Sequence, residues 1–268
     1  MVIGVLGPLV VTVNGTSVVP SAAKPRQVLA LLAANLGRHV SMAAMAEELW
    51  DGTPPGRPSG VVQTYVKQLR HGLSAAFEPV GGPEGKEVLI RSHTGYILDP
   101  PEADVDVDAR EFERLALRGQ RALAEDDVAL AARLLVKALT VWRGPALADV
   151  RTGPVLETEV RRLDEVRRGA LESRIAADLR LGRHAELVSE LTVLTTRYPL
   201  QENLHAQLIL TLCRCGRSWQ ALEVFRKVRA SFVRELGIEP SQRLQRLHHA
   251  ILADDPSLAS PAYDLAVF

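Results

Sequence analysis

The hydrophobic residues change their spacing near residue 20, and this change limits the folds open to the chain. Residues 2–19 are rich in valine and contain Asn14-Gly15, a pair typical of the tight turn between two antiparallel strands. Residues 24–37 instead carry apolar side chains at helical spacing. The chain therefore opens with three short predicted strands and continues with helices, which predicts a mixed α and β first domain.

Two further helices and a hairpin complete this domain. Ser41 can cap the next helix, and a loop rich in glycine and proline over residues 51–60 separates that helix from one over residues 61–73. Residues 88–98 are predicted to form a β-hairpin with Gly95 near its bend. A helix, a turn, a helix and a hairpin make a winged helix-turn-helix, here with the leading strands of the output domains of two-component response regulators.

The helix over residues 61–73 carries one apolar stripe and an opposite face without acidic side chains. The stripe consists of Val62, Val66, Leu69 and Leu73. The opposite face carries Thr64, Lys67, Gln68 and His71, flanked by Gln63, Tyr65 and Arg70. No acidic residue occurs from Arg57 to His71. Such a face is either simply solvated or reads DNA, since Lys and Arg can contact guanine or phosphates and Gln can pair with adenine.

The composition indicates a globular protein but leaves its partner open. The 268 residues are 47% hydrophobic and 24% charged, and Lys+Arg and Asp+Glu balance at 32 each. Any contact with nucleic acid must therefore come from the local placement of charge. The two cysteines, Cys213 and Cys215, predict no disulfide framework. No signal peptide or membrane span is expected, so the predicted location is the cytoplasm.

The second half of the chain is helical in period and contains an internal repeat. Gly182 and Gly216 begin two similar segments 34 residues apart, each with small or apolar residues five and nine positions later. A looser helix pair precedes them between Arg110 and Trp142. A helix-turn-helix repeat of this length is typical of tetratricopeptide-like domains, which bind partners more often than they catalyse reactions.

The predicted fold class is α+β. An N-terminal winged helix-turn-helix with a leading three-stranded sheet and a C-terminal hairpin is followed by an all-α tetratricopeptide-like helical domain. We expect a DNA-binding domain over residues 1–100, a linker over 101–108, a helical activation domain over 109–253 and a tail over 254–268. The proline- and aspartate-rich composition of the linker marks the boundary between the domains.

An ordered set of motifs runs through both halves of the chain. It includes KPRQVLALLAANLGRHVSMAAMAEELW (24–50), VQTYVKQLR (62–70), VWRGPALADV (141–150) and ELGIEP (235–240), with residues 161–187 and 198–229 between the last two. Together these segments resemble the Streptomyces antibiotic regulatory protein (SARP) family, and the second half resembles the bacterial transcriptional activation domain of that family. Larger members append an ATPase module, so the resemblance suggests a minimal two-domain regulator.

The resemblance implies a transcriptional activator of a secondary-metabolite (antibiotic) gene cluster, with no enzymatic activity and no cofactor. It also implies binding to double-stranded promoter DNA at direct repeats near the −35 element, as a tandem dimer and without a membrane partner. RNA polymerase holoenzyme, including sigma factor region 4, is the implied protein partner.

Candidate DNA-binding residues lie on two helices and the hairpin. Lys24 and Arg26, at the start of the first helix, are either solvated or form a phosphate clamp, which the family motif favours. Arg70 either touches DNA or forms an ion pair within the domain, and Tyr65 lies at the edge of the apolar stripe. The full set of candidates is Lys24, Arg26, Gln63, Thr64, Tyr65, Lys67, Gln68, Arg70, His71, Arg91 and Thr94.

The hairpin and the loop over residues 51–60 each raise a question about contacts with DNA or polymerase. The hairpin arginine, Arg91, is shifted by one place from its usual position, which points it to the other side of the hairpin and leaves minor-groove contact open. The loop over residues 51–60 is either a plain connector or a polymerase contact. Its candidate contact residues are Thr53, Pro54, Pro55 and Arg57.

Two other functions compete with transcriptional activation. A protein–protein adaptor would use the helical repeats and would not bind DNA, whereas a repressor would read DNA with the same helix. An enzyme is disfavoured because the sequence has no phosphate-binding loop, metal-ligand cluster or nucleophile motif. Cys213 and Cys215 alone are too few ligands for zinc.

Overall fold

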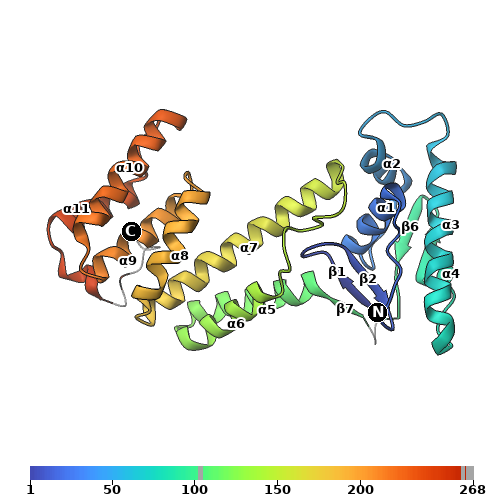
Figure 1. Ribbon diagram of the computed structural model, residues 1–268, viewed down its shortest axis with the longest axis horizontal. Coiled ribbons are helices and arrows are strands. Elements are labelled where there is room, and N and C mark those ends of the chain that lie inside the picture. Colours follow the sequence, from blue (N-terminus) through green and yellow to red (C-terminus); the bar gives the residue numbers. More distant parts are fainter. Residues whose placement is uncertain (102–104, 261–262, 264–268) are drawn as a thin grey trace. The chain divides into compact units, whose positions relative to one another are not determined.

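The computed structural model, which describes residues 1–101, 105–260 and 263, divides into two compact units. Unit 1 comprises Met1–Leu115 and Lys137–Arg168, and unit 2 comprises Ala116–Val136 and Gly169–Phe268. Three helices pass from one unit into the other, namely α5 (Asp108–Ala124), α6 (Val128–Thr140) and α7 (Pro154–Arg180) (Figure 1). This division by packing differs from the predicted sequence domains, whose boundaries stay a prediction. Parts of the predicted linker and tail, residues 102–104, 261–262 and 264–268, lie outside the described residues.

The three predicted strands at the start of the chain are present. They are β1 (Val2–Gly4), β2 (Val10–Val13) and β3 (Thr16–Ser17), paired antiparallel in that order. Asn14 and Gly15 form the β2–β3 turn with φ values of 48° and 81°, the left-handed conformation that these residue types adopt most easily.

A fourth strand joins this sheet from a segment that the sequence predicted as linker. β7 (Asp106–Val107) pairs with β1 in parallel, which gives the strand order β3-β2-β1-β7. β7 has only two residues and its partner strand is more than 100 residues away in the chain, so no local pattern could predict it. Asp106 and Val107 of the predicted linker are therefore part of the sheet of unit 1.

The helices of the winged helix-turn-helix follow the predicted order. They are α1 (Ala23–Ala34), α2 (Met42–Trp50), α3 (Pro58–Phe77) and the short α4 (Gly85–Val88), with a 3-10 turn, η1 (Glu78–Val80), after α3. The predicted cap of α2 is confirmed, because the Ser41 hydroxyl accepts a hydrogen bond from the Ala44 amide at 3.0 Å. Helical spacing predicts that Met42, Met45 and Leu49 face inward; Met45 and Leu49 are buried, whereas Met42 is only half-buried.

The wing is a three-stranded sheet with the order β4-β6-β5. β5 (Leu89–Ser92) and β6 (Gly95–Leu98) form the predicted hairpin, and β4 (Val40–Ser41), which was not predicted, pairs with β6. The hairpin turns at His93 and Thr94. Gly95 lies where β6 meets β4, and a Cβ atom there would lie 1.9 Å from the Val40 carbonyl oxygen.

Unit 2 contains the predicted helical repeat. Its helices beyond α7 are α8 (His184–Arg197), α9 (Glu202–Arg214), α10 (Ser218–Leu236) and α11 (Gln242–Leu252), followed by a 3-10 turn, η3 (Pro256–Ala259). The repeat positions Leu187, Leu191, Ala221 and Phe225 are all buried in one core. The tetratricopeptide-like prediction is therefore confirmed, with Gly182 and Gly216 at φ of 77° and 71° before α8 and α10.

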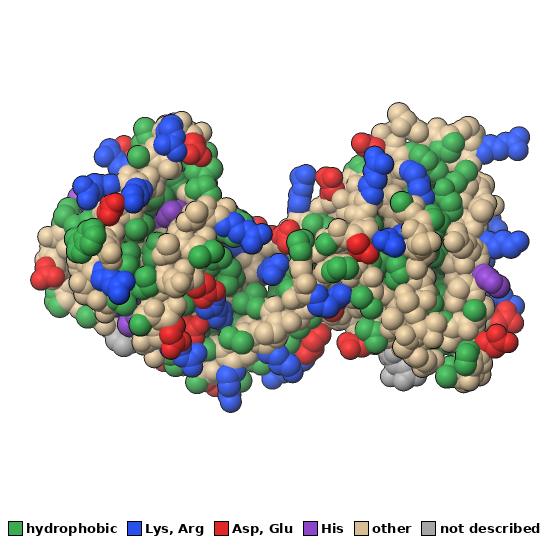
Figure 2. Space-filling model, viewed as in Figure 1, with side chains coloured by type: hydrophobic (Ala, Val, Ile, Leu, Met, Phe, Trp, Pro, Cys, Tyr) green, Lys and Arg blue, Asp and Glu red, His purple; other side chains and the backbone are tan. Residues whose placement is uncertain are grey.

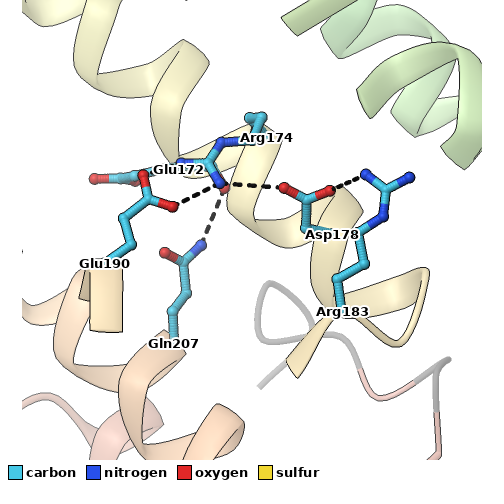
Figure 3. Close-up of polar contacts among 6 residues, drawn as sticks. All are labelled: Glu172, Arg174, Asp178, Arg183, Glu190 and Gln207. Atoms are coloured by element: carbon cyan, nitrogen blue, oxygen red, sulfur yellow. Dashed lines mark hydrogen bonds and ion pairs between the residues drawn. The ribbon is translucent and has the colours of Figure 1, made fainter. Parts of the chain in front are cut away.

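An ionic network centred on the buried Arg174 and Asp178 joins α7 to α8 in unit 2 (Figure 3). Arg174 donates to Asp178 at 3.1 Å and to both carboxylate oxygens of Glu190, while Arg183 donates to the other oxygen of Asp178 at 2.7 Å. Burial alone would lower the pKa of Arg174, but the hydrogen bonds and charges of Glu190 and Asp178 outweigh burial and raise it. Arg174 therefore stays charged inside the unit.

Cys213 and Cys215 are both free thiols. Burial raises the pKa of the Cys213 thiol to about 11, so it is protonated at neutral pH. Within the described ranges, no group of three or more His, Cys, Asp or Glu side chains is placed to hold a metal ion. No helix in that part of the chain is long and apolar enough to cross a bilayer.

Candidate nucleic-acid interface

The apolar stripe of α3 is buried, as predicted. Val62, Val66, Leu69 and Leu73 are each at most 3% exposed. α3 packs with them against α1 and α2, which fixes the rotation of this 20-residue helix about its own axis. The opposite face is therefore directed away from the core of unit 1.

That opposite face is exposed and carries no acidic side chain. Gln63, Thr64, Lys67, Gln68 and His71 are all exposed, and the acid-free stretch extends from Arg57 through Phe77. The Thr64 hydroxyl donates to the Gly60 carbonyl at 3.0 Å, and within the described residues the other four side chains have no hydrogen-bond or ion-pair partner. Figure 2 shows Lys, Arg and His side chains along the edge formed by α3, at the right of the view.

Two of the three flanking residues, Arg70 and Tyr65, are not exposed in the same way. Arg70 is half-buried and donates from Nε and Nη2 to the Leu89 carbonyl at 2.9 and 2.8 Å. Its guanidinium also lies 5.6 Å from the centre of the Tyr96 ring. Arg70 thus fastens α3 to the wing through a carbonyl and a ring, not through an ion pair. Tyr65 is half-buried at the edge of the stripe.

Lys24 and Arg26 at the start of α1 are bound within unit 1. Lys24 donates to the Leu49 carbonyl and lies 5.4 Å from the centre of the Trp50 ring. Arg26 donates to the Pro20 carbonyl at 3.0 Å and pairs with Asp149 at 3.2 Å. These contacts occupy both cations, which favours a structural role over the phosphate clamp suggested by the family motif.

The wing presents Arg91 and Thr94 at its tip. Arg91 is exposed and pairs in register with Tyr96, so it lies on the same side of the hairpin as the buried Leu89. The Thr94 hydroxyl lies 3.2 Å from Nε2 of His39. The hairpin therefore offers one unpaired arginine within the described residues, on the side that carries the core residues of the wing.

The loop between α2 and α3 is fully exposed from Asp51 through Arg57. It leaves α2 through two residues with positive φ, Asp51 at 45° and Gly52 at 81°. The Thr53 amide and hydroxyl both donate to the Trp50 carbonyl, at 3.0 and 2.9 Å. Beyond Thr53 come two prolines, which restrict the backbone, and then Arg57, whose side chain has no partner within the described residues.

Comparison with known proteins identifies the family. Residues 107–252 match the family described as bacterial transcriptional activator domain, and residues 16–98 match the one described as transcriptional regulatory protein, C terminal. Regulatory protein DnrI of Streptomyces peucetius is 48% identical over 258 residues, which are 96% of this chain and 94% of DnrI. The chain belongs to the SARP family. As a SARP-family member it is a transcriptional activator, and membership implies that it acts on DNA and on the transcription machinery.

Further relatives agree with this assignment to the SARP family. Transcriptional regulator RedD of Streptomyces coelicolor is 36% identical over 264 residues, covering 97% of this chain and 73% of RedD. A solved structure of Mycobacterium tuberculosis EmbR, in complex with a low affinity phosphopeptide, superposes with a TM-score of 0.87 at 32% identity. The match covers 99% of this chain and 69% of the EmbR chain, and it confirms the predicted fold class.

Three carboxylates of this SARP-family protein hold unit 1 together and were not identified from the sequence. Asp108 accepts hydrogen bonds from the Val5 and Leu6 amides at 2.9 and 3.0 Å and pairs with Arg143. Asp149 accepts from the Leu9 amide at 2.7 Å in addition to its pair with Arg26. Both lie more than 100 residues from the amides that they bind, so no local pattern could reveal them.

The third carboxylate is Glu48 on α2, which is 2% exposed. It accepts hydrogen bonds from the Gln27 side chain and from two amides at the start of α7. One signal in the sequence could have identified it. Glu48 stands three positions after Met45 and directly before Leu49, so it falls on the apolar face of a helix. A carboxylate in such a position is buried only where hydrogen-bond donors or a cation stabilise it.

Proposed function

We propose that this SARP-family activator binds direct repeats in the promoters of a secondary-metabolite gene cluster and recruits RNA polymerase holoenzyme there. The observation that carries this proposal is the exposed, acid-free face of α3, on which only Thr64 has a hydrogen-bond partner within the described residues. A helix fits the major groove, where Lys can donate to guanine and Gln can pair with adenine. The reading residues are Gln63, Thr64, Lys67, Gln68 and His71, with Arg91 and Thr94 of the wing beside them.

Lys67→Ala and Gln68→Ala are each expected to weaken binding to operator DNA by about 1–3 kcal/mol, the usual cost of one good base contact. Both side chains are exposed, so the melting temperature should stay at the parental value. The affinity is measured by fluorescence anisotropy at fixed salt, because phosphate contacts make it salt-dependent. Lys86→Ala is the matched control, since Lys86 is an exposed lysine of unit 1 outside α3. Parental binding by both α3 variants would refute the reading face.

We assign the polymerase contact to the loop between α2 and α3. Thr53, Pro54, Pro55 and Arg57 are exposed, and Arg57 is a cation without an acidic partner in the described parts of the chain. Its proposed target is an acidic patch on sigma factor region 4. Arg57→Ala should therefore reduce activated transcription and leave DNA affinity unchanged. Equal losses in both measurements would place Arg57 in the DNA contact instead.

We further propose that two copies bind head to tail as a tandem dimer, with repeats about 10–11 base pairs apart on one face of the duplex. One winged domain offers few base contacts, so specific affinity needs a second copy. Inserting about five base pairs between the repeats turns the copies to opposite faces, and cooperative binding and activation should collapse. An insertion of a full turn should partly restore both. Unchanged activity at the half-turn spacing would mean that the copies act independently.

A further inference from the structure

Glu48 joins the end of α2 to the beginning of α7. Its Oε1 accepts from Nε2 of Gln27 at 2.9 Å and from the Gly153 amide at 2.6 Å, and its Oε2 accepts from the Leu156 amide at 2.9 Å. Gly153 directly precedes α7, so its residue type provides no side chain to cap the helix. A carboxylate from a helix 105 residues away thus caps α7.

The contact is close as well as electrostatically favourable. Among the described residues no cationic side chain pairs with Glu48, so its charge is stabilised by the positive end of the α7 dipole and by three donors. The backbones also touch, because a Cβ atom on Gly153 would lie 2.1 Å from the Glu48 carbonyl oxygen. Any side chain at position 153 would push α7 away from α2.

The same turn of α2 is the base of the loop that we assign to polymerase. Leu49 holds Lys24 through its carbonyl, and the Trp50 carbonyl accepts both hydrogen bonds of Thr53. The backbone from Glu48 to Thr53 is therefore fixed by its contacts, and the exposed part of the loop starts from this fixed base. α7 continues for 27 residues and forms part of both compact units.

We propose that Glu48 is a positioning residue for transcriptional activation, which sets the α2–α3 loop against the first turn of α7. This inference rests on the proposed polymerase contact of that loop. The DNA-reading face lies on α3 and is positioned by the separate stripe of Val62, Val66, Leu69 and Leu73. Loss of the Glu48 contact should therefore lower activation far more than it lowers DNA affinity.

The test is Glu48→Gln in the full chain, with Glu48→Asp as a second variant. In Glu48→Gln, the side-chain NH2 group faces an N–H group from which a carboxylate oxygen accepts in the parent, so one hydrogen bond is lost. In Glu48→Asp, the side chain is too short to reach both α7 amides. We expect operator affinity within about twofold of the parent and a fall in activated run-off transcription of roughly tenfold, in the range of typical coupling between sites. Hydrogen exchange at the Gly153 and Leu156 amides should quicken, which reports directly on the broken contact.

Asp108→Asn is the matched control. Asp108 is also a carboxylate that accepts two backbone amides within unit 1, but it begins α5 and binds the amides that follow β1, not the base of the loop. At equal folded fraction, measured by circular dichroism, Asp108→Asn should keep near-parental activation. If both variants lose activation in proportion to stability, or if Glu48→Gln loses DNA affinity equally, the positioning role is refuted. If Arg57→Ala retains full activation, the polymerase loop itself fails, whereas a defect in Arg57→Ala with none in Glu48→Gln refutes only this inference.

Discussion

Leu69→Asp is expected to abolish the folded state of unit 1. Leu69 is 3% exposed in the middle of the α3 stripe, so a carboxylate there would be removed from solvent. The buried charge and the lost apolar contacts together should cost more than about 4–5 kcal/mol. Because a domain is typically stable by only about 5–15 kcal/mol, that loss is sufficient to unfold it or to leave a large unfolded fraction. Thermal unfolding followed by circular dichroism, together with the amide spectrum of α3, measures the effect.

Gln68→Asp is the control for this experiment, since it places the same carboxylate one residue away on the exposed face. It should keep the parental melting temperature and lose DNA affinity, because a negative charge would then face the phosphates. The two neighbouring variants thus separate folding from DNA reading. A soluble Leu69→Asp protein with a parental melting curve would show that the stripe has been assigned to the wrong side of α3.

Asp178→Ala is expected to destabilise unit 2 by about 3 kcal/mol, at the lower end of the cost of breaking a buried ion pair. The substitution leaves Arg174 buried with Glu190 as its remaining acidic partner and removes the partner of Arg183 (Figure 3). The lower end of the range applies because Glu190 still neutralises part of the charge. Native-state hydrogen exchange of the α7 and α8 amides is the appropriate measurement, because a two-unit chain need not unfold in one step.

The control for Asp178→Ala is Glu186→Ala, which removes an exposed acid from the neighbouring helix α8. Its cost should stay within about 0.5 kcal/mol, as for most surface substitutions. Equal protection in the two variants would show that the Arg174 network contributes no more to stability than a surface charge.

Periodicity was sufficient to predict α3, since the stripe from Val62 to Leu73 and the face opposite follow from helical spacing alone. The same holds for the buried positions of the repeat in α8 and α10. These features depend on neighbours three and four residues apart, which the sequence displays directly. The winged helix-turn-helix and the helical domain could therefore both be predicted from the sequence.

Contacts between distant segments could not be predicted in this way. β4 and β7 have two residues each and pair with strands far away in the chain, so no alternation of apolar residues in the sequence predicts them. Lys24 and Arg26 show a related limit, because the residue type predicts a cation but not its partner. Apart from the nearby Pro20 carbonyl, their acceptors are the Leu49 carbonyl of α2 and Asp149 before α7, which only the folded chain brings to them.

The contacts between the first hundred residues and the segment that follows them have a consequence for inheritance of the gene. These contacts are the parallel pairing of β1 with β7 and the hydrogen bonds of Asp108, Asp149 and Glu48. A recombination event that joined the first hundred codons to a foreign partner would remove the acceptors of the Val5, Leu6 and Leu9 amides. It would also remove the α7 amides that Glu48 binds, and leave a buried carboxylate exposed to an unrelated surface. The codons for the winged helix-turn-helix should therefore pass between genomes together with the codons that follow them, at least to the start of α7. Lineages that add new modules are expected to add them outside this joined block.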